Sequence, residues 1–388
     1  MYVLGVRADK LTDNDIQRLI ENQVPEQKTL EYKKELHFAK DADKKEFLFD
    51  ISAMYNTDGG CIIYGIEEEK DSNSQNTGKP QKISGIQIEN TDKLIQQIED
   101  IVKNNTEPSI NHLVIQIISI EEKMILVLGI PKCIGLPTMV TFNQSNKFFK
   151  RRNSGKYAVD VYELNAMFMQ NQMLIQKAEK FRMERIQNVL SQNCIPNLHV
   201  QHAILIHIIP INFLENQLVD FSILAERFTT KMRPIHARGW NYMYNLDGFA
   251  VYSSEDFNRS IVSYNQLLRN GSYEIFSSEL FYPTRHNDQV GFNGFDLIQE
   301  VIRCISEGIE ILNQVKIEAP FFVSFSLHNV KDTIMDNDRR IMGRFSKNEI
   351  IFPFILFPNY ESNPKTLLKP IFDILWQSFG QSKCPDIP

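Results

Sequence analysis

Residues 56–69 read NTDGGCIIYGIEEE, and this stretch decides which fold to expect. Asn56 with Gly59 and Gly60 allows the backbone conformations that reverse a chain tightly. The apolar run CIIYGI (61–66) that follows is typical of a strand buried on both faces. The run then passes directly into three glutamates, so carboxylates gather where this strand ends.

The residues before the turn predict a helix and an earlier strand. In DKKEFLFDISAMY (43–55), Asp43 with Glu46 three residues on suits a helix start, and the apolar residues recur at helical spacing. In PEQKTLEYKKEL (25–36), Leu30 and Tyr32 alternate with Glu31 and Lys33, as in a half-buried strand. The order is therefore strand, helix, tight turn, strand.

The rest of the chain predicts a second folded region. We expect helices at 12–22 and 91–104, strands at 112–120 and 124–131, a hairpin at 138–157 with a basic second arm, and a long helix from 161 to about 189. Beyond it, 199–211 and 321–328 suggest strands, and 294–314 and 366–379 suggest helices. We assign residues 1–170 to one domain, 171–196 to a helical connector and 197–388 to a second α/β domain.

Composition narrows the class of protein. With 388 residues, 43% apolar and 23% charged, the chain suits a soluble two-domain protein. No signal-peptide layout leads the chain, and the longest apolar run (350–357) is far shorter than the roughly 20 residues that span a bilayer. We expect a cytoplasmic protein with no membrane contact. The net charge of −6 means that any nucleic-acid contact must be local.

Familiar catalytic motifs are missing from the sequence. NSGK (153–156) lacks the earlier glycine of a phosphate-binding P-loop, and neither H-E-x-x-H nor G-x-S-x-G occurs. The five cysteines are scattered without the spacing of a zinc site and suit reduced thiols. What remains is the acidic constellation around NTDGG.

That constellation resembles the Schlafen AlbA-2 family. Its motifs stand here as Glu26-(x4)-Glu31-Tyr32-Lys33, Ala53-(x2)-Asn56-Thr57-(x)-Gly59-Gly60 and Gly65-Ile66-Glu67-Glu68. The resemblance covers roughly residues 10–170 and implies an α/β (α+β) fold, with a mixed sheet flanked by helices. Such bacterial proteins are often labelled ATP-binding, a function that the failed P-loop test leaves weakest.

The resemblance also implies a site. In nuclease members of this family three carboxylates bind a divalent metal and cleave RNA, tRNA in particular. Carried over by position, these are Glu26, Glu31 and Glu68, with Mg²⁺ or Mn²⁺ as cofactor. The family has aspartate where this chain has Glu68. Lys33, on the same strand face as Glu31, is added to the catalytic set as a counter-charge and phosphate contact. The alternative is that Lys33 only solvates the strand.

Substrate contacts are expected from the basic arm KFFKRRNSGK (147–156). Its cations and interleaved phenylalanines suit a phosphate backbone and stacked bases. The predicted contacts are Lys150, Arg151, Arg152 and Lys156, together with Asn56 and Thr57 of the motif. The alternative is a solvated hairpin whose phenylalanines belong to the core.

Two functions from different classes stay open. The first is a metal-dependent endoribonuclease acting on tRNA-like RNA, in bacterial stress or phage defence as the resemblance implies. The second is a nucleic-acid-binding regulator that keeps the fold without the chemistry, which the glutamate at position 68 favours. The sequence leaves a homo-oligomer open.

Overall fold

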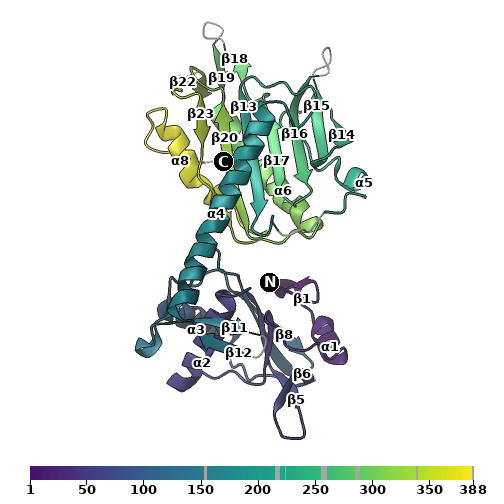
Figure 1. The fold of residues 1–388 in the computed structure, drawn as a ribbon, viewed down its shortest axis with the longest axis vertical. Helices are drawn as coiled ribbons and strands as arrows, with labels where there is room; N and C mark the ends of the chain where they lie inside the picture. The colour runs from purple at the N-terminus through teal and green to yellow at the C-terminus, as the bar shows by residue number, and fades with distance from the viewer. Residues whose placement is uncertain are drawn as a thin grey trace. The chain divides into compact units, whose positions relative to one another are not determined.

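The computed structural model describes residues 1–152, 155–214, 219–222, 224–254, 260–284, 289–337 and 340–386. Contacts divide the chain into two compact units, Met1–Met173 and Leu174–Pro388. Helix α4 (Val161–Leu190) begins in the first unit and ends in the second (Figure 1). Both units mix helices and strands, as the α/β (α+β) prediction requires.

The first unit is built around a four-stranded sheet in the order β3–β4–β9–β8. Strands β3 (Leu30–Lys33) and β4 (Gly60–Tyr64) are parallel, because helix α2 (Asp41–Tyr55) carries the chain back between them. Strands β8 (Val114–Ile120) and β9 (Lys123–Ile130) form the antiparallel half. The predicted order of strand, helix, turn and strand is confirmed.

Alternation along these strands makes two apolar cores. Ile62 and Tyr64 of β4 pack with α2 and α3 (Thr91–Asn105), whereas Cys61 and Ile63 pack with α1 (Asp13–Glu21) on the opposite face. Leu30 and Tyr32 of β3 join the α1 side. The intervening Glu31 and Lys33 pair in register with Ile62 and Tyr64. Two charged residues therefore face α2 at the edge of the sheet.

The turn into β4 requires its glycines because another backbone lies against them. A Cβ on Gly60 would lie 2.3 Å from the Thr29 carbonyl oxygen, and one on Gly59 would lie 2.7 Å from Lys132 N. Both glycines also have positive φ, at 143° and 68°. The NTDGG turn thus holds β4 tightly beside the chain that enters β3.

Three local predictions need correction. Helix α2 begins at Asp41, and Asp43 instead accepts a bond from Lys40 N (3.3 Å) in its first turn. Gly65, at φ 96°, ends β4, so CIIYGI is not one strand. The expected loop 70–82 contains β6 (Asn76–Ile83), which pairs with β5 (Ile66–Lys70). This hairpin projects from the unit (Figure 1), so most of its side chains are polar and no apolar alternation marks it.

The predicted basic arm lies inside a second, smaller sheet in the order β12–β11–β10–β7. Its strands are β7 (Thr106–Glu107), β10 (Met139–Val140), β11 (Lys147–Arg152) and β12 (Gly155–Ala158). Phe149 of β11 stacks on Phe49 of α2, with ring centroids 3.9 Å apart. Asn153 and Ser154 of the arm lie outside the described residues. Packing against α2 sets which residues of β11 face inward.

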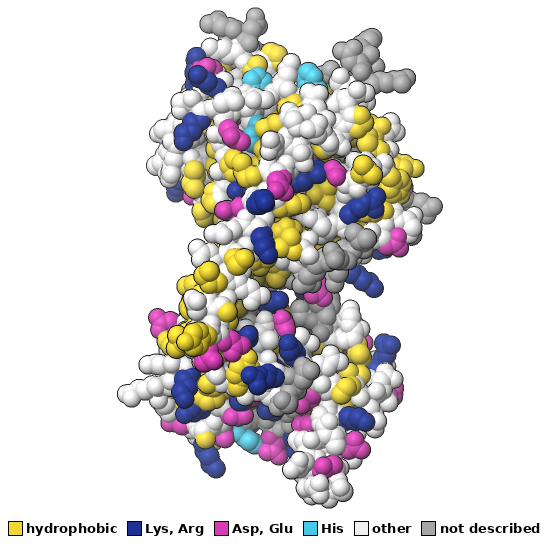
Figure 2. Space-filling model, in the orientation of Figure 1, with side chains coloured by type: hydrophobic (Ala, Val, Ile, Leu, Met, Phe, Trp, Pro, Cys, Tyr) yellow, Lys and Arg dark blue, Asp and Glu magenta, His cyan; other side chains and the backbone are white. Residues whose placement is uncertain are grey.

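Short elements complete the first unit: β1 (Tyr2–Val3), β2 (Val6–Arg7), and the 3-10 helices η1 (Ala8–Lys10) and η2 (Phe142–Gln144). Across the face that Figure 2 shows, basic and acidic side chains are intermixed. No helix of the described residues is long and apolar enough to cross a bilayer.

The second unit contains an eight-stranded sheet with the path β14–β15–β16–β17–β13–β20–β23, and β24 pairs with β20. The strands are β13 (Ala203–Pro210), β14 (Asn241–Tyr244), β15 (Gly248–Ser254), β16 (Ile261–Leu268), β17 (Tyr273–Ser277), β20 (Phe321–His328), β23 (Glu349–Ile351) and β24 (Ile355–Phe357). A smaller sheet holds β18 (Tyr282–Pro283), β19 (Val290–Phe292), β21 (Ile334–Asn337) and β22 (Arg340–Arg344).

The helices of the second unit are α5 (Leu224–Phe228), α6 (Gly294–Gln314), α7 (Pro364–Leu367) and α8 (Lys369–Gln377). α6 confirms the helix expected at 294–314. The expected closing helix at 366–379 is instead two, because Leu368 and Pro370 restart the helix at α8.

Candidate functional site

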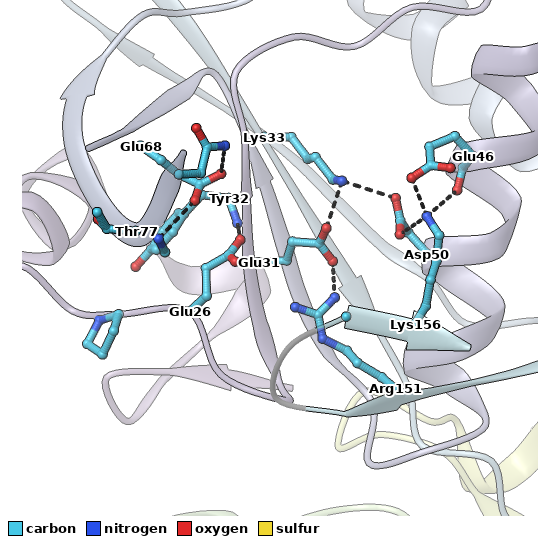
Figure 3. A pocket seen from close by; sticks show the side chains of 14 residues that line it. Glu26, Glu31, Tyr32, Lys33, Glu46, Asp50, Glu68, Thr77, Arg151 and Lys156 are labelled. Carbon is cyan, nitrogen blue, oxygen red and sulfur yellow. Dashed lines mark hydrogen bonds and ion pairs between the residues drawn. The ribbon is translucent and has the colours of Figure 1, made fainter. Parts of the chain in front are cut away.

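One pocket of about 540 Å³ in the first unit gathers charged side chains from four parts of the chain (Figure 3). They come from β3 and the loop before it, from α2, from the β5–β6 hairpin and from the β11–β12 hairpin. The lining residues are Pro25, Glu26, Glu31, Tyr32, Lys33, Glu46, Asp50, Glu68, Asn76, Thr77, Gly78, Arg151, Gly155 and Lys156.

Glu31 lies at the centre of this wall and is held by two cations. Its Oε1 lies 2.8 Å from Lys33 Nζ, and its Oε2 pairs with Arg151 Nη1. Only 7% of Glu31 and 6% of Arg151 are exposed. Burial alone would raise the pKa of Glu31, but the charges of Lys33 and Arg151 outweigh it and lower this pKa. Glu31 is therefore ionised and already paired.

Helix α2 contributes a carboxylate that sequence reasoning missed. Asp50 is 4% exposed, and its two oxygens pair with Lys33 Nζ (3.3 Å) and with Lys156 Nζ. Lys156 also pairs with Glu46, one turn earlier on α2. The available signal was an aspartate inside an apolar helical stripe, where a buried charge requires a partner.

Glu26 and Glu68 meet on the other wall of the pocket, at Gly78 of β6. Gly78 N donates to Glu68 Oε2 (3.1 Å), and Asn76 Nδ2 donates to Glu68 Oε1 (2.8 Å). A Cβ on Gly78 would lie 3.8 Å from Glu26 Oε2. Tyr32 N donates to Glu26 Oε1 (2.8 Å). Two acidic side chains thus share one glycine as their neighbour.

Burial raises the pKa of Glu26 to about 7, and the charges of Glu68 and Glu31 add to this effect. The bond from Tyr32 N and the Arg151 charge oppose it. A carboxyl group with this pKa exchanges a proton near neutral pH, which is the property of a general acid or base. The adjacent Glu67 points elsewhere, to Lys34 and Lys82 at 3.1 Å each, and does not line the pocket.

Asn56 and Thr57, predicted as substrate contacts, instead have bonds within the protein. The Asn56 side chain bonds both backbone groups of Thr138 at 2.8 Å and the Phe149 carbonyl at 3.1 Å. Thr57 Oγ1 accepts from Arg151 N (2.9 Å). Because these bonds use the polar atoms of Asn56, the geometry favours a structural role: the motif ties α2 to the strand that carries Arg151.

The predicted basic contacts divide between two faces of the β11–β12 hairpin. Arg151 and Lys156 are cross-strand partners, so both point to the pocket, where they neutralise acids. Lys150 lies on the other face and pairs with Glu163 of α4 (2.9 Å). Arg152 is exposed and stacks over Tyr157, 4.2 Å from the ring centroid. Of the four, Arg152 is the most exposed, which suits a phosphate contact outside the pocket.

Comparison with known proteins identifies this part of the chain. Residues 26–160 match the family model described as Schlafen, AlbA_2. These residues form a Schlafen AlbA_2 domain. Every lining residue of the pocket except Pro25 belongs to the AlbA_2 domain.

Two solved structures are similar to part of the chain. The DIP2311 protein from Corynebacterium diphtheriae is 14% identical, with a TM-score of 0.26, over 37% of this chain and 26% of that protein, so the chain spans about a quarter of its length. The N-terminal domain of a RecG-related protein from Nitrosomonas europaea is 15% identical, with a TM-score of 0.28, over 37% of this chain and 88% of that chain. No curated protein matches.

The arrangement of carboxylates in the pocket tests the predicted metal triad. Within the described ranges, no group of three or more His, Cys, Asp or Glu side chains is arranged to hold a metal ion. Glu31 is engaged by Lys33 and Arg151, which leaves Glu26 and Glu68. Mg²⁺ is commonly held by one or two carboxylates together with substrate phosphates. The donor set therefore fits a cation shared with substrate and not an all-protein cage of Glu26, Glu31 and Glu68.

Proposed function

We propose that the AlbA_2 domain binds RNA and cleaves it as a metal-dependent endoribonuclease. AlbA_2 domains often bind nucleic acid. The observation that carries the proposal is the pairing of Glu26 with Glu68 at Gly78, across the pocket from Lys33. Carboxylates opposite an ammonium group suit a phosphodiester, whose oxygens need both a cation and hydrogen-bond donors.

Glu26 and Glu68 would hold Mg²⁺ or Mn²⁺, while Glu31 serves a different purpose. A divalent cation there would neutralise charge on the phosphodiester and orient a water molecule. Glu31 holds Lys33 in place, and we propose this role for it instead of metal ligation.

Lys33 supplies the phosphate contact. Asp50 and Glu31 raise its pKa above the ordinary lysine value although burial opposes them, so Lys33 stays charged. An ammonium group has three donors, and Glu31 and Asp50 accept two of them. The third remains for a phosphate oxygen in the pocket that Lys33 lines. Glu26, with a pKa of about 7, can take up or release the proton of the reaction near neutral pH.

From the family resemblance we further propose tRNA-like RNA as the substrate and bacterial stress or phage defence, in the cytoplasm, as the setting. The second candidate is a nucleic-acid-binding regulator without chemistry. The two cations on Glu31 favour it, because they occupy a carboxylate that nuclease relatives use for metal.

Cleavage of total tRNA with and without Mn²⁺ or Mg²⁺ tests the proposal. Wild-type protein should give discrete fragments only with metal, and Glu68→Gln or Glu26→Gln should lower the cleavage rate by about 100-fold or more. Both variants should still bind RNA, because every basic side chain that can contact phosphate is unchanged.

The matched control is Glu69→Gln, on the same hairpin but outside the pocket and bonded to Thr77 (3.3 Å). It should cleave like wild type. RNA binding by wild type without fragments under either metal supports the regulator and rejects the nuclease.

A further inference from the structure

Asp50 is a carboxylate enclosed between two lysines from separate segments. Lys33 belongs to β3 and Lys156 to β12, and each meets one oxygen of Asp50. Burying an isolated carboxylate is costly, so these two partners are what permits an aspartate in an apolar helical stripe. Burial raises the pKa of Asp50, and the Glu31 charge adds to it, against the effect of both lysines.

The pairing extends into an alternating chain of charges along one wall of the pocket (Figure 3). In order, its members are Arg151, Glu31, Lys33, Asp50, Lys156 and Glu46. Each inner member touches two groups of opposite charge. Within this chain of charges, Asp50 joins Lys33 of β3 to Lys156 of β12.

Exposure separates the two lysines, which can meet a ligand, from Asp50 between them, which cannot. The side chains of Lys33 and Lys156 are 32% and 18% exposed, whereas that of Asp50 is 5% exposed. A free lysine side chain samples many rotamers, so a partner that fixes it in advance lowers the entropy cost of later phosphate binding.

We infer that Asp50 is a positioning residue, which holds Lys33 and Lys156 as a fixed pair of contacts for the phosphates of an RNA strand. The inference rests on the proposed RNA binding by this pocket. Asp50 itself does not contact the RNA. It orients both ammonium groups and cancels part of their charge, so that the pocket favours a correctly placed phosphate over any anion.

Asp50→Asn separates positioning from simple structural support. The amide keeps the shape but removes the charge, so the two lysines lose one of their two acidic partners each. The gain in net positive charge should offset the lost ordering, so RNA binding should be at least as tight and its salt dependence steeper, by up to about 0.7 in log–log slope for each lysine. The cleavage rate should fall about 10-fold, because both contacts lose their fixed geometry. A purely structural residue would instead lower thermal stability, binding and cleavage together.

Ser52→Ala is the control, since Ser52 is fully buried on the same helix but outside the pocket. It should leave the salt slope and the cleavage rate unchanged. A salt slope of Asp50→Asn equal to that of wild type, or equal losses of binding and cleavage, would overturn the inference.

Two further results, a wild type that does not cleave RNA and a variant that does not fold, still test the role of Asp50. If wild type binds RNA but never cleaves it, the nuclease proposal fails, and the salt slope alone still decides the role of Asp50. If Asp50→Asn does not fold, Lys156→Gln tests the same pair: it should flatten the salt slope by about 0.7, and an unchanged slope would overturn the inference.

Discussion

The two units each bury a network of charges beneath a helix, and the two networks differ in what they leave open. In the first unit the chain around Asp50 borders a pocket, and its lysines are partly exposed. In the second unit Glu274 is fully buried, and Arg185 of α4 donates to both of its oxygens at 2.8 Å. His207 (3.2 Å) and Tyr264 (2.9 Å) also bond Glu274.

The contrast shows how similar residue types serve different ends. Arg185 and its partners satisfy both oxygens of the buried Glu274, so the network fastens the second half of α4 to its sheet. Arg185 also pairs with the partly exposed Asp247 (2.8 Å), so the enclosed part of this network is the part around Glu274. The network around Asp50 ends at a pocket and leaves donors for a ligand. Enclosure with full pairing indicates a structural role, and partial exposure of cations indicates binding.

The largest expected effect is loss of the enclosed network. Arg185→Leu removes the guanidinium from the buried Glu274 and leaves it only His207 and Tyr264 as partners, so the second unit should lose about 3–5 kcal/mol of unfolding free energy. Chemical unfolding followed by a probe in that unit measures this loss. Arg185→Leu combined with Glu274→Leu should recover part of the stability, because no lone charge remains.

The RNA affinity of Arg185→Leu tests whether the network around Glu274 is separate from the pocket. It should match wild type, since Arg185 lies in the second unit and does not line the pocket. A loss of stability below about 1 kcal/mol would mean that this network does not fasten the helix.

A smaller contrast lies between two neighbouring arginines of β11. Arg151→Ala removes one of the two partners of buried Glu31 and should cost about 2 kcal/mol in the first unit. Arg152→Ala should leave stability nearly unchanged and flatten the salt slope of RNA binding by about 0.7. Thermal melts and salt titrations of both variants would reveal the division. Equal salt slopes for Arg152→Ala and wild type would show that the exposed face of the β11–β12 hairpin does not contact RNA phosphates.

Local pattern was enough to predict the strand–helix–turn–strand unit and the acidic residues near it. Alternation placed Glu31 and Lys33 on one face, and the Gly59 and Gly60 signal was clear because only glycine fits a turn so close to other backbone. The acidic motif also led to Glu26 and Glu68, which do line one pocket.

What could not be predicted depends on contacts between distant segments. The direction of Arg151 is set by its register with Lys156 and by the packing of β11 on α2, far from Glu31 in sequence. In the sequence Asp50 is one polar residue in an apolar helical stripe, and only the fold brings Lys33 and Lys156 to it. The β5–β6 hairpin was missed because it buries too little apolar surface to produce a period.

The last expected effect is a pH dependence, which Glu26 on the acidic wall of the pocket should show and the enclosed Glu274 should not. The pKa of Glu26 is raised to about 7 from an ordinary value near 4.5. Protonated Glu26 therefore favours the folded state below pH 4.5, and this contribution is lost as pH rises to about 7. The pKa of Glu274 is held far below its ordinary value, because Arg185 outweighs the effect of burial, so Glu274 should contribute no slope in that window.

Chemical unfolding at several pH values between 4.5 and 7.5 compares wild type with Glu26→Gln, which cannot titrate. The difference in first-unit stability between them should shift in favour of Glu26→Gln as pH rises, and then level off above pH 7. Mg²⁺ at pH 7.5 should stabilise wild type more than the variant, because a cation favours ionised Glu26. Parallel curves at all pH values would show that Glu26 titrates alike in the folded and unfolded chain. The acidic wall would then be as inert in this range as the enclosed network around Glu274.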